Sequence, residues 1–401
     1  MTKDSRLDNT IRRDSYNTII FDLRRRKEIY LVGGYLRDTL MGIDSNDRDY
    51  IIKGNISHFV RHVQRKMGGT IIAFKDKDIM RLVLKNGQTF DFIRFYGKLE
   101  KDISKRDFTI NALAWSPRRG LIDMHNGIKD LQKRRVCAIS ENNLIDDPLR
   151  MLRAYRFSAE MNGSVDSQTR KIIKRHHKKI HSVSPERITL EIFHLLNTHL
   201  SSKYMKIALK DNILIDILPL CKNMLAHQLK VIHSLEKKIL HMVPSNIKVL
   251  LHDIYAQNLS YKGLLCLEIL LQDHSNCNQM SHLKMSNKII DRIALTRNGI
   301  RELRKNKKIT LNKLFDIFHK AGQASIDAIV ISNRLELLKN YRRFERIWTK
   351  SLLRSDEVMR ISGVEPGPQL GDLLLLLKKA QFEGWLKSKY QASKLIKSMY
   401  S

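Results

Sequence analysis

Apolar and polar positions alternate over short distances in the first third of the chain, and this pattern predicts strands and helices in turn. The apolar run 29–32 has the length of a buried strand and ends at two glycines, after which residues 35–41 have helical spacing. A basic helix is predicted over 57–67, and the polar segment 1–27 is expected to contain one short helix. Further strand-like runs lie at 50–52, 70–74, 80–84 and 89–95, with a hairpin-type Asn-Gly pair between the last two.

From about residue 141 onwards the pattern is helical almost throughout, and the whole chain has only seven prolines. We therefore predict an α+β fold, in which a small head with a mixed β-sheet and helices precedes a long all-α part. The predicted divisions are a head at 1–140, a neck at 141–210, and a body with a tail at 211–401.

Charge narrows the class of partner. Lysine and arginine total 73 residues against 41 aspartates and glutamates, a formal net charge of +32. Such an excess favours a polyanionic partner, because counterion release then supplies much of the affinity. A generally basic proteome or a solvated basic face would give the same excess.

Targeting and cysteine patterns point to a cytoplasmic protein. The N-terminal residues lack the apolar core of a signal peptide, and no apolar run approaches the length of a membrane span, so we expect no membrane association. The four cysteines show no metal-type or disulfide-type spacing and are expected to be reduced and scattered in the core: Cys137, Cys221, Cys266 and Cys277.

Two carboxylates follow the glycine turn. Asp47 and Asp49 alternate at the start of the next strand, so both side chains point to one face. Gly33 and Gly34, which lack Cβ atoms, let the backbone approach a ligand closely. Paired hard oxygen ligands beside such a turn suit Mg²⁺ that holds a nucleoside triphosphate.

This segment resembles the first signature of the class II nucleotidyltransferases. The signature begins with the glycine pair, continues with Arg37-Asp38 and an LxG triplet, and ends with the DxD triplet. This family comprises tRNA CCA-adding enzymes, their CC-adding and A-adding relatives, and bacterial poly(A) polymerases. The resemblance implies that Asp47 and Asp49 are catalytic metal ligands. It also implies nucleotide binding by Gly33, Gly34, Arg37 and Asp38.

A third carboxylate, Asp91, alternates with Phe90 and Phe92 in the last predicted strand. It is expected to face away from the two rings and towards Asp47 and Asp49, where it could help to activate the attacking hydroxyl. The alternative is a solvated edge residue, and the sequence leaves this choice open.

The segment 104–115 resembles the second family signature, RRDFTxNA, with Lys105 in place of the first arginine. The resemblance implies that Arg106 contacts the nucleotide phosphates. Asp107 and Asn111, one helical turn apart, would lie near the ribose.

A third cluster begins with two aspartates and a proline. Pro148 fits the first turn of a helix that Asp146 and Asp147 would cap. The family motif here is EDxxR, with Asp146 in place of the glutamate. The resemblance implies that Asp147 and Arg150 read the incoming base through Watson–Crick-like hydrogen bonds.

Arg150, Arg153 and Arg156 recur every three residues along one side of the same helix. Three such close guanidinium groups need an anion between them, and the expected guest is a triphosphate, or a base edge plus a phosphate. On this reasoning Arg153 and Arg156 reach the nucleotide phosphates. An ordinary basic amphipathic helix is the alternative.

A dense basic stretch follows at 171–181. It is either a track for RNA phosphates or a solvated helix face, and the net charge favours the former. Its three histidines are expected to lie on a charged face rather than to bind metal, because no carboxylate or cysteine accompanies them in the sequence. The candidate RNA-binding residues are Lys171, Lys174, Arg175, Lys178 and Lys179.

The later chain resembles other parts of these enzymes more loosely. Residues 184–191 match a neck helix, and 227–275 resemble a degenerate HD domain. The His252-Asp253 and Gln272-Asp273 pairs do not complete a phosphohydrolase metal site, so we interpret the region as scaffold. After the segment 360–371 we expect one helix that ends near Tyr390.

The resemblance implies Mg²⁺-dependent, template-independent addition of C and A from CTP and ATP to the tRNA 3′ end, with the helical part gripping the acceptor stem. The segment from Asp91 to Arg106 is short, as in CC-adding specialists, so CC-only addition ranks close to full CCA addition. Poly(A) polymerase is third. A non-catalytic RNA-binding protein and a metal-dependent phosphohydrolase are the alternatives outside this class.

Overall fold

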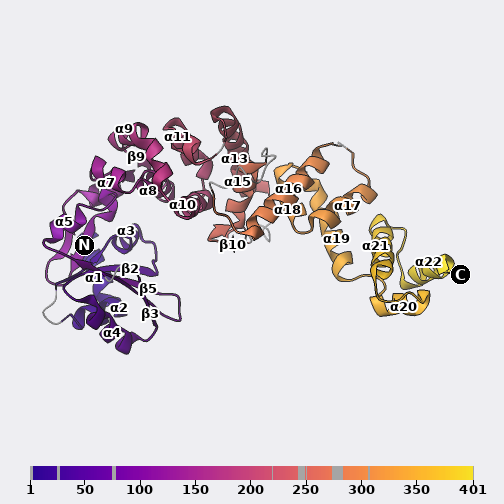
Figure 1. Cartoon of the computed structure of the whole chain (residues 1–401), viewed down its shortest axis with the longest axis horizontal. Coiled ribbons are helices and arrows are strands. Elements are labelled where there is room, and N and C mark those ends of the chain that lie inside the picture. The colour runs from indigo at the N-terminus through magenta and orange to yellow at the C-terminus, as the bar shows by residue number, and fades with distance from the viewer. Residues whose placement is uncertain are drawn as a thin grey trace. The chain divides into compact units, whose positions relative to one another are not determined.

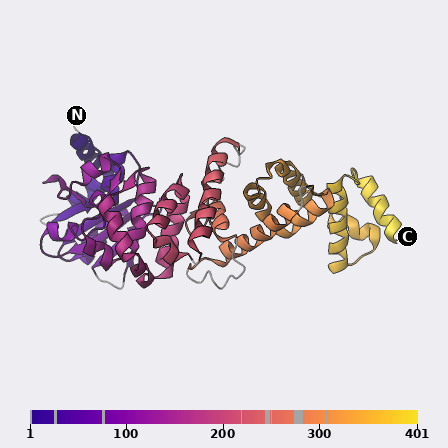
Figure 2. The same cartoon turned by 90° about the horizontal axis from the view of Figure 1, so that it is seen from above.

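The computed structural model describes residues 3–24, 28–74, 78–218, 220–242, 249, 251–272, 283–305 and 308–400. The chain divides into two compact units, Met1–Ala226 and His227–Ser401. The first combines a sheet with helices, and the second is helical apart from one short hairpin (Figures 1 and 2). This confirms the predicted α+β fold. The three-part division at 140 and 210 stays a prediction.

The first unit is built on a seven-stranded sheet with the order β3-β4-β5-β2-β1-β6-β7. Neighbouring strands are antiparallel except β2 and β5, which are parallel, so the sheet is mixed as predicted. The strands are β1 (Ile29–Val32), β2 (Asp47–Lys53), β3 (Thr70–Ala73), β4 (Ile79–Val83), β5 (Thr89–Phe95), β6 (Leu113–Ser116) and β7 (Gly120–Asp123).

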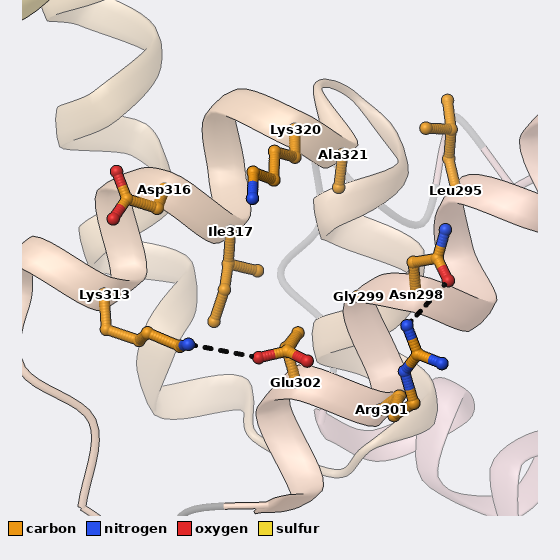
Figure 3. A pocket seen from close by; sticks show the side chains of 10 residues that line it. All are labelled: Leu295, Asn298, Gly299, Arg301, Glu302, Lys313, Asp316, Ile317, Lys320 and Ala321. Carbon is orange, nitrogen blue, oxygen red and sulfur yellow. Dashed lines mark hydrogen bonds and ion pairs between the residues drawn. The ribbon is translucent and has the colours of Figure 1, made fainter.

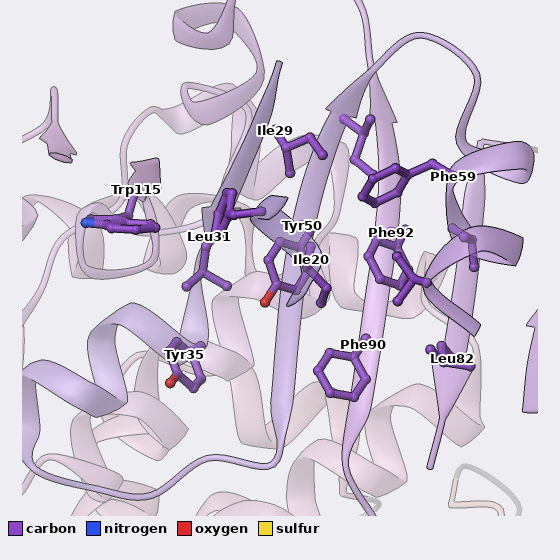
Figure 4. Packing of buried hydrophobic residues seen from close by; sticks show 14 of the residues in the cluster. Ile20, Ile29, Leu31, Tyr35, Tyr50, Phe59, Leu82, Phe90, Phe92 and Trp115 are labelled. Carbon is purple, nitrogen blue, oxygen red and sulfur yellow. The ribbon is translucent and has the colours of Figure 1, made fainter. Parts of the chain in front are cut away.

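One face of the sheet is covered by N-terminal helices and α4 (Ile56–Met67). Tyr50 and Phe92 on the two parallel strands stack with ring centroids 5.5 Å apart, and the Phe59 ring meets Phe92 edge-on (Figure 4). The prediction of one short leading helix is wrong. Two helices form, α1 (Lys3–Arg13) and α2 (Ser15–Asp22), because Asp14 breaks the run and caps the second.

Further helices begin in the first unit, and several of them carry motif residues. They are α3 (Gly34–Met41), α5 (Leu99–Ile103), η1 (Thr109–Asn111), α6 (Gly127–Gln132), α7 (Glu141–Asp146), α8 (Leu149–Glu160), α9 (Ser167–His176), η2 (His177–Ser182), α10 (Pro185–Asn197), α11 (Ser201–Lys210), α12 (Ile213–Ile217) and α13 (Lys222–Met242), which continues into the second unit. The short strands β8 (Arg135–Val136) and β9 (Ser164–Val165) pair in parallel.

The second unit starts, after α13, with the hairpin β10 (Ile254–Ala256) and β11 (Leu259–Ser260). Its helices are α15 (Tyr261–Leu271), α16 (Asn287–Lys305), α17 (Leu311–Ala321), α18 (Ala324–Ile331), η4 (Leu335–Leu337), α19 (Leu338–Thr349), α20 (Ser355–Ser362), α21 (Pro368–Glu383) and α22 (Lys389–Tyr400).

The C-terminal prediction of one helix ending near Tyr390 is wrong. α21 stops at Glu383, because Gly384 has the left-handed φ of 94° that ends a helix, and α22 then begins at Lys389. Leu373 of α21 and Ile396 of α22 are buried in one core with Val358 of α20.

Candidate functional site

The two carboxylates of the first motif lie at the start of β2 and share one face of the sheet. Along β2 the burial alternates: Asp47 is exposed, Arg48 is buried, and Asp49 is half-buried. The parallel neighbour β5 places Thr89 opposite Asp47 and Asp91 opposite Asp49. The Thr89 hydroxyl donates a hydrogen bond to the Asp47 carboxylate.

Asp91 lies on the predicted face, because Phe90 and Phe92 beside it are fully buried on the other side of the sheet. Its carboxylate is not free. Arg81 on β4, directly opposite Asp91, donates two hydrogen bonds of 2.6 Å, one to each carboxylate oxygen. The sequence motifs did not single out Arg81, and only the β4–β5 hairpin register could have pointed to it.

Gly33 lies beside the same row of charges. A Cβ built at Gly33 would be 2.6 Å from Arg106 Nη1 and 3.3 Å from Asp49 Oδ2, so a side chain there would displace the Arg106 guanidinium. The Gly33 φ of 76° also favours glycine. Arg106 of the second motif and Asp49 of the first motif therefore meet beside Gly33, and the close approach of a ligand to this turn stays a prediction.

The electrostatics of this site suit a divalent cation. Burial raises the pKa of Asp49, Arg106 lowers it, and the nearby Asp91 and Asp47 carboxylates raise it. A bound cation would relieve this repulsion between carboxylates. Within the described ranges, no three His, Cys, Asp or Glu side chains form a metal site by themselves. Asp47 and Asp49 thus fit an ion that takes its other oxygen ligands from substrate and water.

Helix α3 joins the first motif to the second. Arg37 Nη1 donates a 2.6 Å hydrogen bond to Asn111 Oδ1, and Arg37 Nε donates one of 2.9 Å to Asp38. The Arg37 guanidinium also lies over the Phe157 ring, 4.8 Å from its centroid. Burial raises the pKa of Asp38, and Arg37 opposes that rise.

The prediction that Asp107 and Asn111 lie one helical turn apart is wrong, because Phe108 is extended and only a 3-10 turn follows it. They still meet: Asn111 Nδ2 donates a 2.9 Å hydrogen bond to Asp107 Oδ1. Burial would raise the pKa of Asp107. Arg153 and the hydrogen bonds from Asn111 and the Phe108 N–H hold it below its ordinary value.

The predicted capping of α8, the helix that carries Arg150, Arg153 and Arg156 (the arginine helix), is wrong. Asp147 ends α7, Pro148 precedes α8, and no side chain caps the N-terminus of α8. The Asp147 carboxylate instead accepts a 2.9 Å hydrogen bond from Arg187 on α10, and Arg150 Nε lies 3.9 Å from it. Asp147 is extended and Pro148 has helical dihedrals, so the backbone turns into α8 at Pro148, but no side-chain hydrogen bond caps that helix.

Beside Arg153 and Arg156, carboxylates of the protein itself lie where the sequence predicted an external anion. Glu191 on α10 accepts a 2.7 Å hydrogen bond from Arg156 Nε and lies 3.7 Å from Arg153 Nη1. Asp107 takes a second ion pair from Arg153, at 2.9 Å. Phosphate contacts by Arg153 and Arg156 stay predictions. Glu191 was visible in the neck motif, but its partners depend on how α10 packs against α8.

Arg150 is held mainly by backbone, and its ion pair with Asp147 is long, at 3.9 Å. Its Nη1 donates hydrogen bonds to the carbonyl oxygens of Lys105, at 2.9 Å, and Asn143, at 3.1 Å. This joins the arginine helix to the second motif. The role of Arg150 in base selection stays a prediction.

The five candidate RNA-binding residues on α9 and η2 are all exposed: Lys171, Lys174, Arg175, Lys178 and Lys179. Two of them form ion pairs, Lys174 with Asp211 at 3.4 Å and Arg175 with Glu141 at 3.0 Å. Their exposure is compatible with both the RNA track and the solvated face, and RNA binding stays a prediction.

Carboxylates from elsewhere in the chain do accompany the histidines of this stretch, although none does in the sequence. His176 lies 2.6 Å from Glu141, and His177 forms a hydrogen bond with Asp216. These carboxylates come from α7 and α12, which are distant from the histidines in sequence.

In the HD-like region, His252 and Asp253 are exposed. Gln272 donates a 2.9 Å hydrogen bond to Gln228, and Asp273 lies outside the described residues. The described part of this region holds no group of metal ligands. Its interpretation as scaffold stays a prediction.

A pocket of about 240 Å³ lies in the second unit, between α16 and α17 (Figure 3). Its lining mixes both signs of charge, and Glu302 pairs with Lys313 at 3.3 Å. It has neither the glycine turn nor the paired carboxylates of the first unit, so it is no alternative to the site on β2.

The cysteine prediction is only partly right. Cys137, Cys221 and Cys266 are free thiols, but only Cys266 is buried, while Cys221 is exposed. Cys277 lies outside the described residues. Among the described helices, none is long and apolar enough to cross a membrane.

Two protein-family models match the chain. "Poly A polymerase head domain" covers residues 85–137, and "Probable RNA and SrmB- binding site of polymerase A" covers residues 164–225. A "CCA-adding enzyme" of Levilactobacillus brevis is 25% identical over 364 residues, which are 86% of this chain and 87% of that protein. These matches support the resemblance of the chain to the class II nucleotidyltransferase family.

A "CC-adding tRNA nucleotidyltransferase" of Synechocystis is 36% identical to this chain over 189 residues. That match spans 46% of the chain and less than half, 45%, of the Synechocystis protein. The structure "Thermotoga maritima CCA-adding enzyme complexed with tRNA_CCA" has the same fold, with a TM-score of 0.78, 18% identity, and coverage of 99% of this chain and 98% of that one.

Proposed function

We propose that the protein is a template-independent tRNA nucleotidyltransferase that adds C and A nucleotides from CTP and ATP to the tRNA 3′ end. The observation that carries this proposal is the meeting of Gly33, Asp49 and Arg106 at the start of β2, beside Asp47 and Asp91. The similarity to the CCA-adding enzymes of L. brevis and T. maritima supports it. A cytoplasmic location stays a prediction.

The proposed reaction is attack of the RNA 3′-hydroxyl on the α-phosphate, with pyrophosphate leaving. Asp47 and Asp49 would hold Mg²⁺, which when bound neutralises phosphate charge and lowers the pKa of the attacking hydroxyl. Gly33 and Gly34 let backbone N–H groups come close to the phosphates. Arg106, which lies against Gly33, is placed to contact the same phosphates.

Base choice is assigned to Asp147 and Arg150, with Arg187 as a residue that orients Asp147. The 2.9 Å hydrogen bond from Arg187 holds one Asp147 oxygen, which leaves the other available to accept from a base amino group. Arg150 is held by two backbone carbonyls, and its guanidinium has further N–H groups for an acceptor on the base. Arg153, Arg156, Arg37, Asp38, Asp107 and Asn111 complete the proposed nucleotide site.

A CC-adding specialist is the second candidate. β5 ends at Phe95 and α5 begins at Leu99, so residues 96–98 are the whole connection between them. Short connections here accompany CC-only addition in the family, and the Synechocystis relative is named as CC-adding. Under either candidate, the first additions are of C.

The test uses purified protein, Mg²⁺, and tRNA transcripts that end before CCA, at C-C, or at CCA. Each is incubated with CTP, ATP or both, and the 3′ ends are sequenced. Products that end in CCA support full addition, and products that stop at C-C support the specialist. Long A tails would make the protein a poly(A) polymerase. No extension, or extension by an Asp47→Ala, Asp49→Ala variant, would refute the assignment.

A further inference from the structure

Four charged side chains stand in a row across the catalytic face of the sheet. The register places Arg81 of β4 opposite Asp91 of β5, and Asp91 opposite Asp49 of β2. Arg106 lies beyond Asp49, against Gly33. The order along the row is therefore cation, carboxylate, carboxylate, cation.

Arg81 and Asp91, at one end of this row, form a bidentate ion pair with each other. Nε and Nη2 of Arg81 each donate a 2.6 Å hydrogen bond, to Oδ1 and Oδ2 of Asp91 respectively. This two-pronged geometry is the strongest that arginine and a carboxylate can form. Both Asp91 oxygens are committed to Arg81, whereas Asp49 has Arg106 nearby but, among the described residues, no such two-pronged partner.

The Arg81–Asp91 ion pair can nevertheless be broken by competing partners. The Arg81 side chain is 42% exposed and that of Asp91 20% exposed, so water and ligands can reach both. Half-exposed pairs are held weakly compared with buried ones, because solvent screens their attraction. A change at Arg81 alone would release the Asp91 carboxylate toward Asp49.

We propose that Arg81 is a positioning residue that holds Asp91 out of the metal site, so that the cation is bound by Asp47 and Asp49 alone until the pair opens. This inference rests on the proposed function, since it concerns the metal of the same reaction. It assigns Asp91 a conditional role, as a third carboxylate that Arg81 withholds or releases. The bidentate pair and the register of β4 on β5 support this role.

The test measures Mn²⁺ binding to the full chain, from the electron paramagnetic resonance signal of free Mn²⁺, without nucleotide or RNA and at one pH. Four proteins form a cycle: wild type, Arg81→Gln, Asp91→Asn, and the double variant. Arg81→Gln should bind Mn²⁺ about tenfold more tightly, because a third carboxylate joins the ion. Asp91→Asn alone should change the affinity by less than about twofold, because Arg81 already occupies that carboxylate.

The double variant separates two explanations for tighter binding. If Arg81 acts by withholding Asp91, the gain disappears when Asp91 is also replaced. If the gain persists in the Asp91→Asn background, Arg81 acts only through its charge, and the proposal is overturned. An unchanged Mn²⁺ affinity in Arg81→Gln would overturn it as well.

Arg94→Gln is the matched control. Arg94 is on β5, is 38% exposed, and pairs with Asp78 at 3.7 Å, but it points to the opposite face of the sheet. It should leave Mn²⁺ binding unchanged. Arg81→Lys keeps the charge but loses the two-pronged bond, so it should bind Mn²⁺ between wild type and Arg81→Gln. Thermal unfolding of each variant checks that the sheet is intact.

The failure of the proposed function would look different. If the four proteins show the expected Mn²⁺ affinities but the wild type extends no tRNA, the transferase assignment is refuted and the role of Arg81 stands. A protein that adds C and A but shows no Arg81-dependent gain would do the reverse.

Discussion

Glu191 of α10 is the buried anion that pairs with Arg153 and Arg156 of α8, and its replacement is the sharpest test of how these two helices are held together. Glu191 is 7% exposed and receives Arg156 at 2.7 Å, with Arg153 at 3.7 Å. Glu191→Gln removes the negative charge but keeps the shape. It leaves Arg156, whose side chain is 14% exposed, with one carboxylate instead of two.

The cost can be bounded from these contacts. Breaking a buried ion pair by removing one partner typically costs about 3–5 kcal/mol. Arg156 keeps Glu160 at 2.8 Å, and Arg153 keeps Asp107 at 2.9 Å, so neither cation is stranded. The glutamine oxygen can also still accept a hydrogen bond. We therefore expect a loss of about 2 kcal/mol in the free energy of unfolding of the first unit, or about 4–8 °C in Tm.

The assay is urea unfolding followed by tryptophan fluorescence. Trp115 lies in the first unit, whereas Trp348 and Trp385 lie in the second, so a Trp348→Phe, Trp385→Phe background makes the signal report the first unit alone. The control is Glu160→Gln, because Glu160 is 36% exposed and its pair with Arg156 is worth less than about 1 kcal/mol. Equal losses in the two variants would refute the reasoning that Glu191 is the structural anion.

Three further predictions concern the site and the tail. Gly33→Ala should lower kcat/KM for CTP by about 10²-fold without unfolding the protein, because the new Cβ displaces the Arg106 guanidinium; unchanged kinetics would contradict the close approach. The raised pKa of Asp49 means that its stabilising contribution is present at acid pH and is lost as the pH rises through that pKa, so Asp49→Asn should raise Tm at neutral pH and not at acid pH. A lowered Tm of Asp49→Asn at neutral pH would show that the Asp49 carboxylate stabilises the fold there, contrary to this reasoning. Gly384→Ala should destabilise the α21–α22 turn by about 1 kcal/mol, because φ is 94° there, whereas Gly371→Ala within α21 should be neutral or stabilising in the same thermal scan.

Local chemistry was readable along the chain wherever one segment carried the whole signal. The strand–glycine–helix turn, the alternation of Asp47 and Asp49, and the Asn86-Gly87 hairpin depend on residues within a few positions of one another. Backbone sterics and period-two alternation act over the same short range, so these features could be predicted. The side of the sheet that Asp91 occupies followed from the same alternation.

Partners that come from distant elements could not be predicted in this way. Arg81 reaches Asp91 only through strand register, and Glu191 reaches Arg156 only because α10 packs against α8. The Asp147 carboxylate meets Arg187 for the same reason, where the sequence suggested a helix cap. Sequence alone indicated the motif residues of the candidate site and the short segments on which they lie. The tertiary structure decided which charges neutralise one another, because ion pairing acts over a few ångströms in space and is blind to separation along the chain.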